Sequence, residues 1–165
     1  YTGVGGNRYA NECTHGFYAD IKDPDSCFLY PNQYVNYNES SEAVIKANSL
    51  SEGKNSQTEV FRAICDFVKN NFDYDFIRQV SASATTVPDI DSTFSTGKGL
   101  CQDLAAMTVC MLRSQGIPAR LMIGSHGSSA YHAWVTAVVD NKDVFFDPTG
   151  EMNASPKDQQ YSTER

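Results

Sequence analysis

Residues 97–105 have the sequence Gly-Lys-Gly-Leu-Cys-Gln-Asp-Leu-Ala, and the expected fold and chemistry follow from this stretch. Two glycines end a polar segment, and Cys101 then opens an apolar run that predicts a helix to about Gln115. A thiol in the first helical turn lies near the positive end of the helix dipole and near backbone N–H groups that lack intrahelical partners. This position favours the thiolate and supplies donors to an oxyanion, so Cys101 is a candidate nucleophile. A buried cysteine with a purely structural role explains the same residue.

Two later residues can complete a nucleophilic site around this thiol. His132 begins a predicted strand, and an imidazole there can take the thiol proton and return it to a leaving group. Asp147 follows the next predicted strand and can fix the tautomer of that histidine. In isolation, a histidine at a strand end is usually structural, and an aspartate before proline is commonly a turn former. The case therefore depends on the three residues together.

The spacing of the two strands tests whether His132 and Asp147 can meet. With a turn at Asn141-Lys142, Asp147 faces Thr136, on the same side of the sheet as His132. The remaining offset of four residues spans about 13 Å, which is too long for a hydrogen bond. A contact therefore predicts either a register centred on Val139-Asp140 or a bulge.

Other patterns predict the surrounding elements. Ser56-Gln57-Thr58-Glu59 matches a capping box and leads into an apolar stripe at helical spacing, with a stop at Asn70-Asn71. A shorter helix is expected over 42–50, and strands over 119–123, 132–139 and 144–146. Gly116 is expected to end the helix of Cys101 in the left-handed conformation. Residues 81–99 are expected to form a long surface loop and residues 124–130 a flexible one.

Composition limits the classes of function. The 165 residues carry a net charge of −7, which disfavours nucleic acids and anionic membranes as main partners. No apolar run approaches the roughly 20 residues that span a bilayer, and the chain contains no secretory signal segment. We expect a single domain, in which 1–57 are an N-terminal extension packed on the core, 58–150 the catalytic core and 151–165 a C-terminal tail.

The five cysteines divide into three groups. Cys13 and Cys27 lie in a loop-like stretch and can close a ring of about 15 residues, worth about 3 kcal/mol, although two free thiols are an equal alternative. Cys65 and Cys110 fall on apolar parts of predicted helices, where a free cysteine behaves as a small hydrophobe. A zinc site from Cys13, His15 and Cys27 matches no common spacing and lacks a fourth ligand, so we expect no metal and no cofactor.

Four motifs in order resemble the transglutaminase-like superfamily. They are Gly99-Leu-Cys101-Gln-Asp103-Leu-Ala105, the segment 111–120, Tyr131-His-Ala-Trp134 and Asp147-Pro-Thr149. The resemblance covers roughly residues 58–150, and it includes a helix at 63–68 followed by a "Tyr-Asp" element at Tyr74-Asp75. It implies an α+β, papain-like fold in which the nucleophile helix packs against an antiparallel sheet. It also implies that Cys101 is the nucleophile, His132 the base and acid, and Asp147 the orienting carboxylate.

Further residues are candidates for the substrate cleft, each with a structural alternative. Trp134 serves equally well in core packing, Tyr74 as a buried structural tyrosine, and His126 as a solvated loop residue. Asp103, Arg113 and Arg120 are expected to form a structural ion pair rather than to act in catalysis. The complete set of cleft candidates is Tyr74, Gly99, Gln102, His126, Tyr131 and Trp134.

The resemblance implies a thiol enzyme that cleaves or transfers peptide or protein amides through a cysteine thioester. Hydrolysis is favoured, with cell-surface and cell-wall peptides among the candidate substrates. The alternatives are transamidation of protein glutamine, a non-catalytic binding or adaptor domain, and a redox or zinc module built on the N-terminal cysteines. The possible Cys13–Cys27 bridge and the resemblance to secreted bacterial members favour an extracellular or bacterial cell-surface location.

Overall fold

The computed structural model of the chain describes residues 2–3, 9–10, 14, 16, 18, 20, 22–81, 86–126, 129–153 and 161–163. Cys13 and His15 lie outside this part, and Cys27 is a free cysteine, which agrees with the alternative of two free thiols rather than with the Cys13–Cys27 bridge. The elements are β1 (Thr2–Gly3), β2 (Tyr9–Ala10), the 3-10 helix η1 (Ser26–Leu29), α1 (Glu42–Ser51), α2 (Gln57–Asn71), β3 (Asp73–Tyr74), α3 (Phe76–Gln79), α4 (Ile90–Thr96), β4 (Lys98–Gly99), α5 (Cys101–Ser114), β5 (Ala119–His126), β6 (Ser129–Val139), β7 (Lys142–Phe146), α6 (Pro148–Asn153) and β8 (Tyr161–Thr163).

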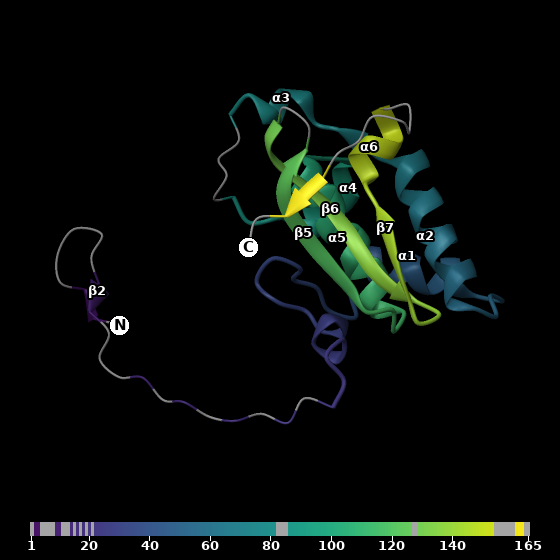
Figure 1. Ribbon diagram of the computed structural model, residues 1–165. Helices are drawn as coiled ribbons and strands as arrows, with labels where there is room; N and C mark the ends of the chain where they lie inside the picture. Colours follow the sequence, from purple (N-terminus) through teal and green to yellow (C-terminus); the bar gives the residue numbers. More distant parts are fainter. Residues whose placement is uncertain are drawn as a thin grey trace.

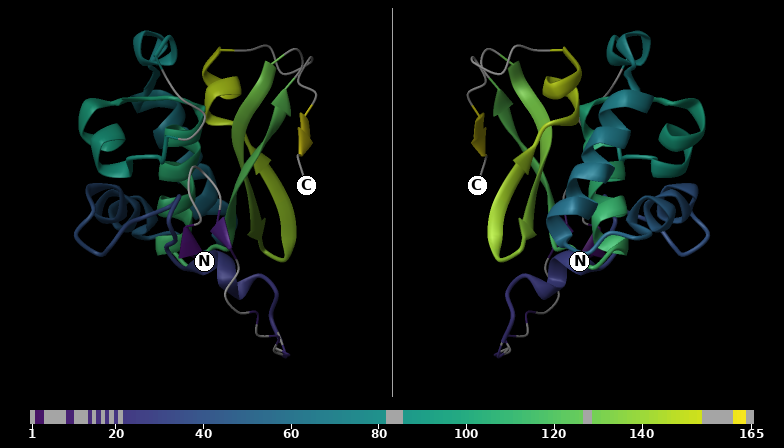
Figure 2. Two further views of the ribbon diagram at one scale, coloured as in Figure 1. Left: turned by 90° about the vertical axis from the view of Figure 1, so that its left-hand side faces the viewer. Right: turned by 90° about the vertical axis from the view of Figure 1, so that its right-hand side faces the viewer.

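Helix α5 is the centre of the core, and every residue from Cys101 to Arg113 is buried. The antiparallel sheet β7-β6-β5-β8 packs against it, and α1, α2 and α4 also contact it. The two views of Figure 2 show the sheet as one layer and the helices as another. Because α5 is enclosed on several sides, it is apolar around most of its circumference rather than along one stripe. The predicted α+β fold, with the nucleophile helix packed on an antiparallel sheet, is confirmed.

The caps of the long helices follow the sequence signals closely. Ser56 Oγ accepts a hydrogen bond from Glu59 N at 3.2 Å, as the capping box predicts. The Glu59 carboxylate instead accepts from Asn55 N at 2.8 Å, one residue earlier than the motif requires. Gly116 follows α5 with φ +72°, the left-handed conformation expected there.

Two predicted loops are wrong. The stretch expected as a loop over 81–99 contains α4, because Asp89 caps that helix by accepting from Ser92 N at 2.9 Å and Gly97 ends it at φ +69°. It also contains β4, which pairs in parallel with β3. The loop expected over 124–130 is largely strand, since β5 continues to His126 and β6 begins at Ser129.

The hairpin of β6 and β7 adopts neither of the expected turns. Its turn residues are Asp140 and Asn141, with φ +49° and +60°, the conformations of a type I′ turn. Val135 pairs with Phe146, so the next position along, Asp147, comes level with Trp134. The offset from His132 is then two residues on the same face, a diagonal of about 7–8 Å that two side chains can bridge.

Close packing at Gly99 fixes the approach to the nucleophile helix. A Cβ at this position would lie 2.9 Å from Asp103 Cβ and 2.9 Å from Thr93 Cγ2. We expect Gly99→Ala to destabilise the protein by about 1–3 kcal/mol, because backbone or side chains must shift to admit the methyl group. Urea denaturation measures this, with the exposed Ser95→Ala as control. Equal stability of the two variants would contradict the packing argument.

Two arginines attach the segment before α1 to the core. Arg113 Nη1 donates to Tyr30 O at 2.7 Å. Arg120 forms an ion pair with Asp25, and its guanidinium lies 4.5 Å from the centroid of the Phe28 ring. These contacts replace the ion pair expected among Asp103, Arg113 and Arg120.

Part of the stretch expected as a C-terminal tail is structured. Met152 in α6 packs against the core, and Glu151 forms an ion pair with Lys69 of α2 at 3.1 Å. Strand β8, the yellow arrow in Figure 1, pairs with β5. The residues of β5 in this pairing are Gly124, Ser125 and His126. None of the helices in the described ranges has the length and apolar character needed to cross a bilayer.

Candidate active site

Cys101, His132 and Asp147 come together at the amino end of α5. Cys101 is the first residue of that helix and is 8% exposed. His132 Nε2 lies 2.7 Å from Asp147 Oδ2. Asp147 is 1% exposed, and its Oδ1 accepts a hydrogen bond from Thr149 N at 3.0 Å. A buried carboxylate with one oxygen on the ring and the other on the backbone holds the imidazole in a fixed orientation.

The Cys101 thiol lies close enough to the same imidazole to act on its pKa. Because Asp147 occupies Nε2, the ring nitrogen open to the thiol is Nδ1. Burial lowers the pKa of His132, but hydrogen bonds and charge from Asp147 and Cys101 outweigh it and raise that pKa to about 9. At neutral pH the imidazole therefore carries a proton that it can give up. This arrangement is capable of proton transfer between sulfur and nitrogen.

A local irregularity in β6 brings two successive residues to α5. Gly124 pairs with His132, whereas His126 pairs with Ser129, so the register shifts by one residue between them. In a regular strand Tyr131 and His132 would point to opposite faces. With the shift, His132 lies near Cys101, which acts on its pKa, and Tyr131 donates a hydrogen bond to Gln102, the next residue of the helix. Such bulges re-aim side chains near functional sites.

Gln102 is an internal connector within the site. It is 4% exposed; its Oε1 accepts from Tyr131 Oη at 2.7 Å and its Nε2 donates to Thr86 O at 2.8 Å. Gln102 thus links β6, α5 and the segment before α4. The observed contacts of Gln102 and Tyr131 are structural, and their contact with substrate stays a prediction.

Trp134 packs against the catalytic candidate His132. Its ring stacks on the imidazole with centroids 6.2 Å apart and an interplanar angle of 23°, and the side chain is 4% exposed. Trp134 therefore has the packing role that is the structural alternative to a place in the substrate cleft. The indole also shields one face of the ring from water, which strengthens the electrostatic interaction with Asp147.

Asp103 stabilises the start of α5. Its side chain is fully buried, and its Oδ2 accepts from Leu100 N at 3.0 Å and from Arg78 Nη1 at 2.7 Å. Within the described residues, Oδ1 has no hydrogen-bond partner. Sequence reasoning missed Arg78, because no local pattern marks an arginine of one short helix as the partner of a distant carboxylate.

Tyr74, in β3, lies near Cys101 and Asp103. Burial raises the pKa of Tyr74, and the charges of Cys101 and Asp103 raise it further. Its ring contacts Phe76 edge-to-face, with centroids 5.0 Å apart. The phenol is thus protonated at neutral pH and able to donate a hydrogen bond.

The remaining candidates are not brought to the thiol by any described contact. Only the backbone of His126 is described, as part of β5. Gly99 has a packing role, and Cys27 is an exposed thiol whose Sγ donates to Pro24 O. Burial raises the pKa of Cys65, and raises that of Cys110 to about 12, so both are unreactive core residues as predicted. In the described ranges no group of His, Cys, Asp and Glu could hold a metal ion.

A buried helix that opens on a cysteine, facing an antiparallel sheet that carries histidine and aspartate, defines a papain-like architecture. Residues 46–148 match the family described as the transglutaminase-like superfamily, and the chain belongs to that superfamily. No curated protein matches the sequence.

Several solved structures share the fold. A proposed cysteine protease from Cytophaga hutchinsonii has a TM-score of 0.65 at 22% identity, over 87% of this chain and 47% of that one. The periplasmic domain of TgpA from Pseudomonas aeruginosa has a TM-score of 0.60 at 22% identity, over 77% of this chain and 47% of that one. A protein described as a TGase has a TM-score of 0.56 at 19% identity, over 71% of this chain and 34% of that one. The chain therefore spans less than half of each of these structures.

Proposed function

We propose that this chain is a thiol-dependent hydrolase of peptide or protein amides, with Cys101, His132 and Asp147 as its catalytic triad. The observation that carries the proposal is one imidazole that lies 2.7 Å from a buried carboxylate and close enough to a helix-terminal thiol for the thiol to act on its pKa. The three roles follow from the atoms available: a sulfur nucleophile, a ring that moves one proton, and a carboxylate that fixes the ring.

The first half of the reaction forms a thioester. The Cys101 thiolate attacks the amide carbonyl carbon, and the carbonyl electrons move to oxygen to form an oxyanion. The N–H groups of Cys101 and Gln102, in the first turn of α5, are placed to donate to this oxyanion. His132 then gives its proton to the amide nitrogen, the C–N bond breaks, and the amine leaves.

The second half returns the enzyme to its starting state. His132, now neutral, removes a proton from water, and the hydroxide attacks the thioester carbonyl. The C–S bond breaks, the acid is released and the Cys101 thiolate faces the reprotonated imidazole. An amine in place of water would give a new amide, so transamidation shares every step up to the thioester.

The similar structures are compatible with hydrolysis and with transamidation. One is a proposed cysteine protease and another is described as a TGase. We propose hydrolysis as the main reaction and a peptide or protein as the substrate. The similarity to a periplasmic domain also supports an extracytoplasmic location for this chain.

A peptide-profiling assay tests the proposed reaction. The purified chain is incubated with a mixed peptide library, with and without a primary amine such as cadaverine, and products are identified by mass spectrometry. We expect new peptide termini that are absent with Cys101→Ala. Cadaverine-modified peptides without cleavage products would replace hydrolysis by transamidation, and the absence of both products would contradict the proposed function.

A further inference from the structure

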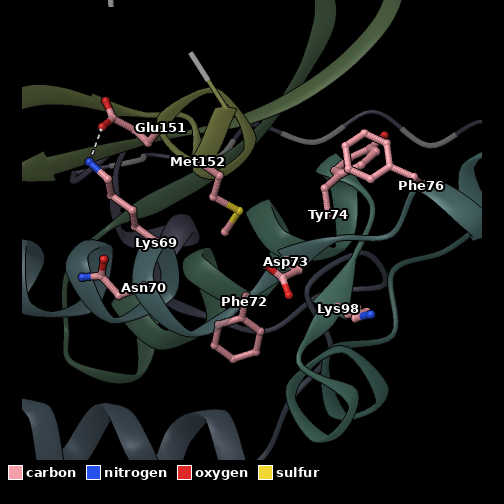
Figure 3. Close-up of a pocket in the computed structure, with 9 residues that line it drawn as sticks. All are labelled: Lys69, Asn70, Phe72, Asp73, Tyr74, Phe76, Lys98, Glu151 and Met152. Atoms are coloured by element: carbon pink, nitrogen blue, oxygen red, sulfur yellow. Dashed lines mark hydrogen bonds and ion pairs between the residues drawn. The ribbon is translucent and has the colours of Figure 1, made fainter. Parts of the chain in front are cut away.

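A cavity of about 540 Å³ is lined by segments that lead to Cys101 and Asp147 along the chain, although no triad residue lines it. Its walls come from the end of α2, from β3 and β4, from the start of α3, and from α6, as Figure 3 shows. This volume is within the range of pockets that bind small molecules or short peptide segments. The lining residues are Lys69, Asn70, Phe72, Asp73, Tyr74, Phe76, Lys98, Glu151 and Met152.

The cavity adjoins the triad along three chain segments. Strand β4 contributes Lys98 and leads within three residues to Cys101. Helix α6 contributes Glu151, whose N–H donates to Asp147 O at 3.0 Å. Tyr74 lines the cavity, and its pKa responds to the charge of Cys101. A substrate with its amide at the thiol would therefore extend past Tyr74 into this space.

The cavity is lined by two basic and two acidic side chains. Lys69 and Glu151 form an ion pair that joins α2 to α6 across one side of the cavity (Figure 3). Asp73 and Lys98 are register partners on the parallel strands β3 and β4, so their side chains share one face. In the described part of the chain, neither of these two side chains has a hydrogen bond or an ion pair. The cavity thus presents one unpaired carboxylate and one unpaired ammonium group.

We infer that this cavity is the substrate subsite for a peptide segment that carries both an ammonium and a carboxylate group. Asp73 binds the ammonium group and Lys98 the carboxylate. A ligand with a single sign of charge would meet one attractive and one repulsive group here, and a purely apolar ligand would leave both desolvated. Aromatic and thioether side chains of the cavity pack against the stem of the bound segment. This inference rests on the proposed function, because it assumes that Cys101 reacts with a peptide.

Aza-peptide epoxides provide the test, because they carry peptide on both sides of the electrophile and alkylate a reactive cysteine. Four probes differ only in one residue pair, Lys-Asp, Ala-Ala, Lys-Lys or Asp-Asp, and each is made with the pair on the amino side or on the carboxyl side of the electrophile. The rate constant of Cys101 alkylation is measured for the wild type, for Asp73→Asn/Lys98→Met and for the control Lys54→Met/Glu39→Gln, whose exposed residues lie outside the cavity. Iodoacetamide, which has no peptide, measures the intrinsic reactivity of Cys101 in each protein.

We expect the Lys-Asp probe to react about fivefold to tenfold faster than the other three with the wild type and the control, as two exposed charge contacts would give. The cavity variant should lose this preference and keep its iodoacetamide rate. Equal rates of all four probes with the wild type, or a preference that persists in the cavity variant, would overturn the subsite while leaving the reactive thiol in place. An unreactive Cys101 toward iodoacetamide would overturn the proposed function and the subsite with it.

Discussion

Cys101→Ser is expected to lower amide turnover at least about 10⁴-fold while the protein keeps its fold. Serine is close to cysteine in size, so the packing at the start of α5 is retained. Its hydroxyl is a far weaker nucleophile than a thiolate beside a protonated imidazole. The rate is measured on the fastest peptide from the library assay, and folding is checked by thermal denaturation.

The exposed Cys27 supplies the matched control for this substitution. Cys27→Ser removes a thiol without touching α5, and its turnover should equal that of the wild type. If Cys101→Ser retained turnover, or if Cys27→Ser lost it, the assignment of the nucleophile would be wrong.

Asp147→Asn should reduce turnover about 10³- to 10⁴-fold, because the amide cannot stabilise the imidazolium and permits the wrong tautomer. The variant also loses the main interaction that raises the pKa of His132 to about 9. That pKa should therefore fall toward the ordinary value of about 6.5. The imidazolium, present in the wild type up to about pH 9, would then be lost near neutral pH.

An NMR titration of the His132 ring in both proteins measures this shift directly. Asp143→Asn is a suitable control, because Asp143 is an exposed carboxylate of β7 and is not part of the site. A His132 pKa that is the same in the Asp147→Asn variant and the wild type would show that the carboxylate does not govern the imidazole.

The long elements were predictable because their signals are local. The Ser56 cap, the Gly116 stop and the apolar composition of the Cys101 helix each act within a few residues. Helix α4 was missed although Asp89 and Gly97 mark both its ends, because only a few apolar side chains lie between them. A short helix of this kind is stabilised by packing against α5, which no local pattern reports.

The local sequence pattern alone did not predict the contact between His132 and Asp147. Sequence alone favoured a turn at Asn141-Lys142, whereas the turn is at Asp140-Asn141, where both residues have positive φ. Moving the turn by one residue reduces the offset between histidine and aspartate from four residues to two. The side chains of His132 and Asp147 span the remaining distance, and Asp147 lies between the end of β7 and the start of α6. Turn geometry thus determines whether the site can form.

The residues that support the site could not be predicted from local sequence, because their positions depend on long-range contacts. Arg78 reaches Asp103 from a four-residue helix, and the shifted register at Tyr131 depends on pairing between β5 and β6. Similarly, Asp73 and Lys98 become neighbours only because β3 and β4 pair in parallel. Such contacts follow from tertiary packing, so the motifs that carry the chemistry were visible in the sequence and the residues around them were not.

The rate of iodoacetamide labelling at pH 7, resolved by peptide mass spectrometry for Cys101 and Cys27 in the same sample, tests the central claim most directly. Accessibility alone favours Cys27, which is exposed, over Cys101, which is 8% exposed. A thiol that shares its proton with His132 should reverse that order, with Cys101 reacting at least about ten times faster. Faster labelling of Cys27 would mean that the imidazole does not activate the buried sulfur, and the account of this site would be wrong.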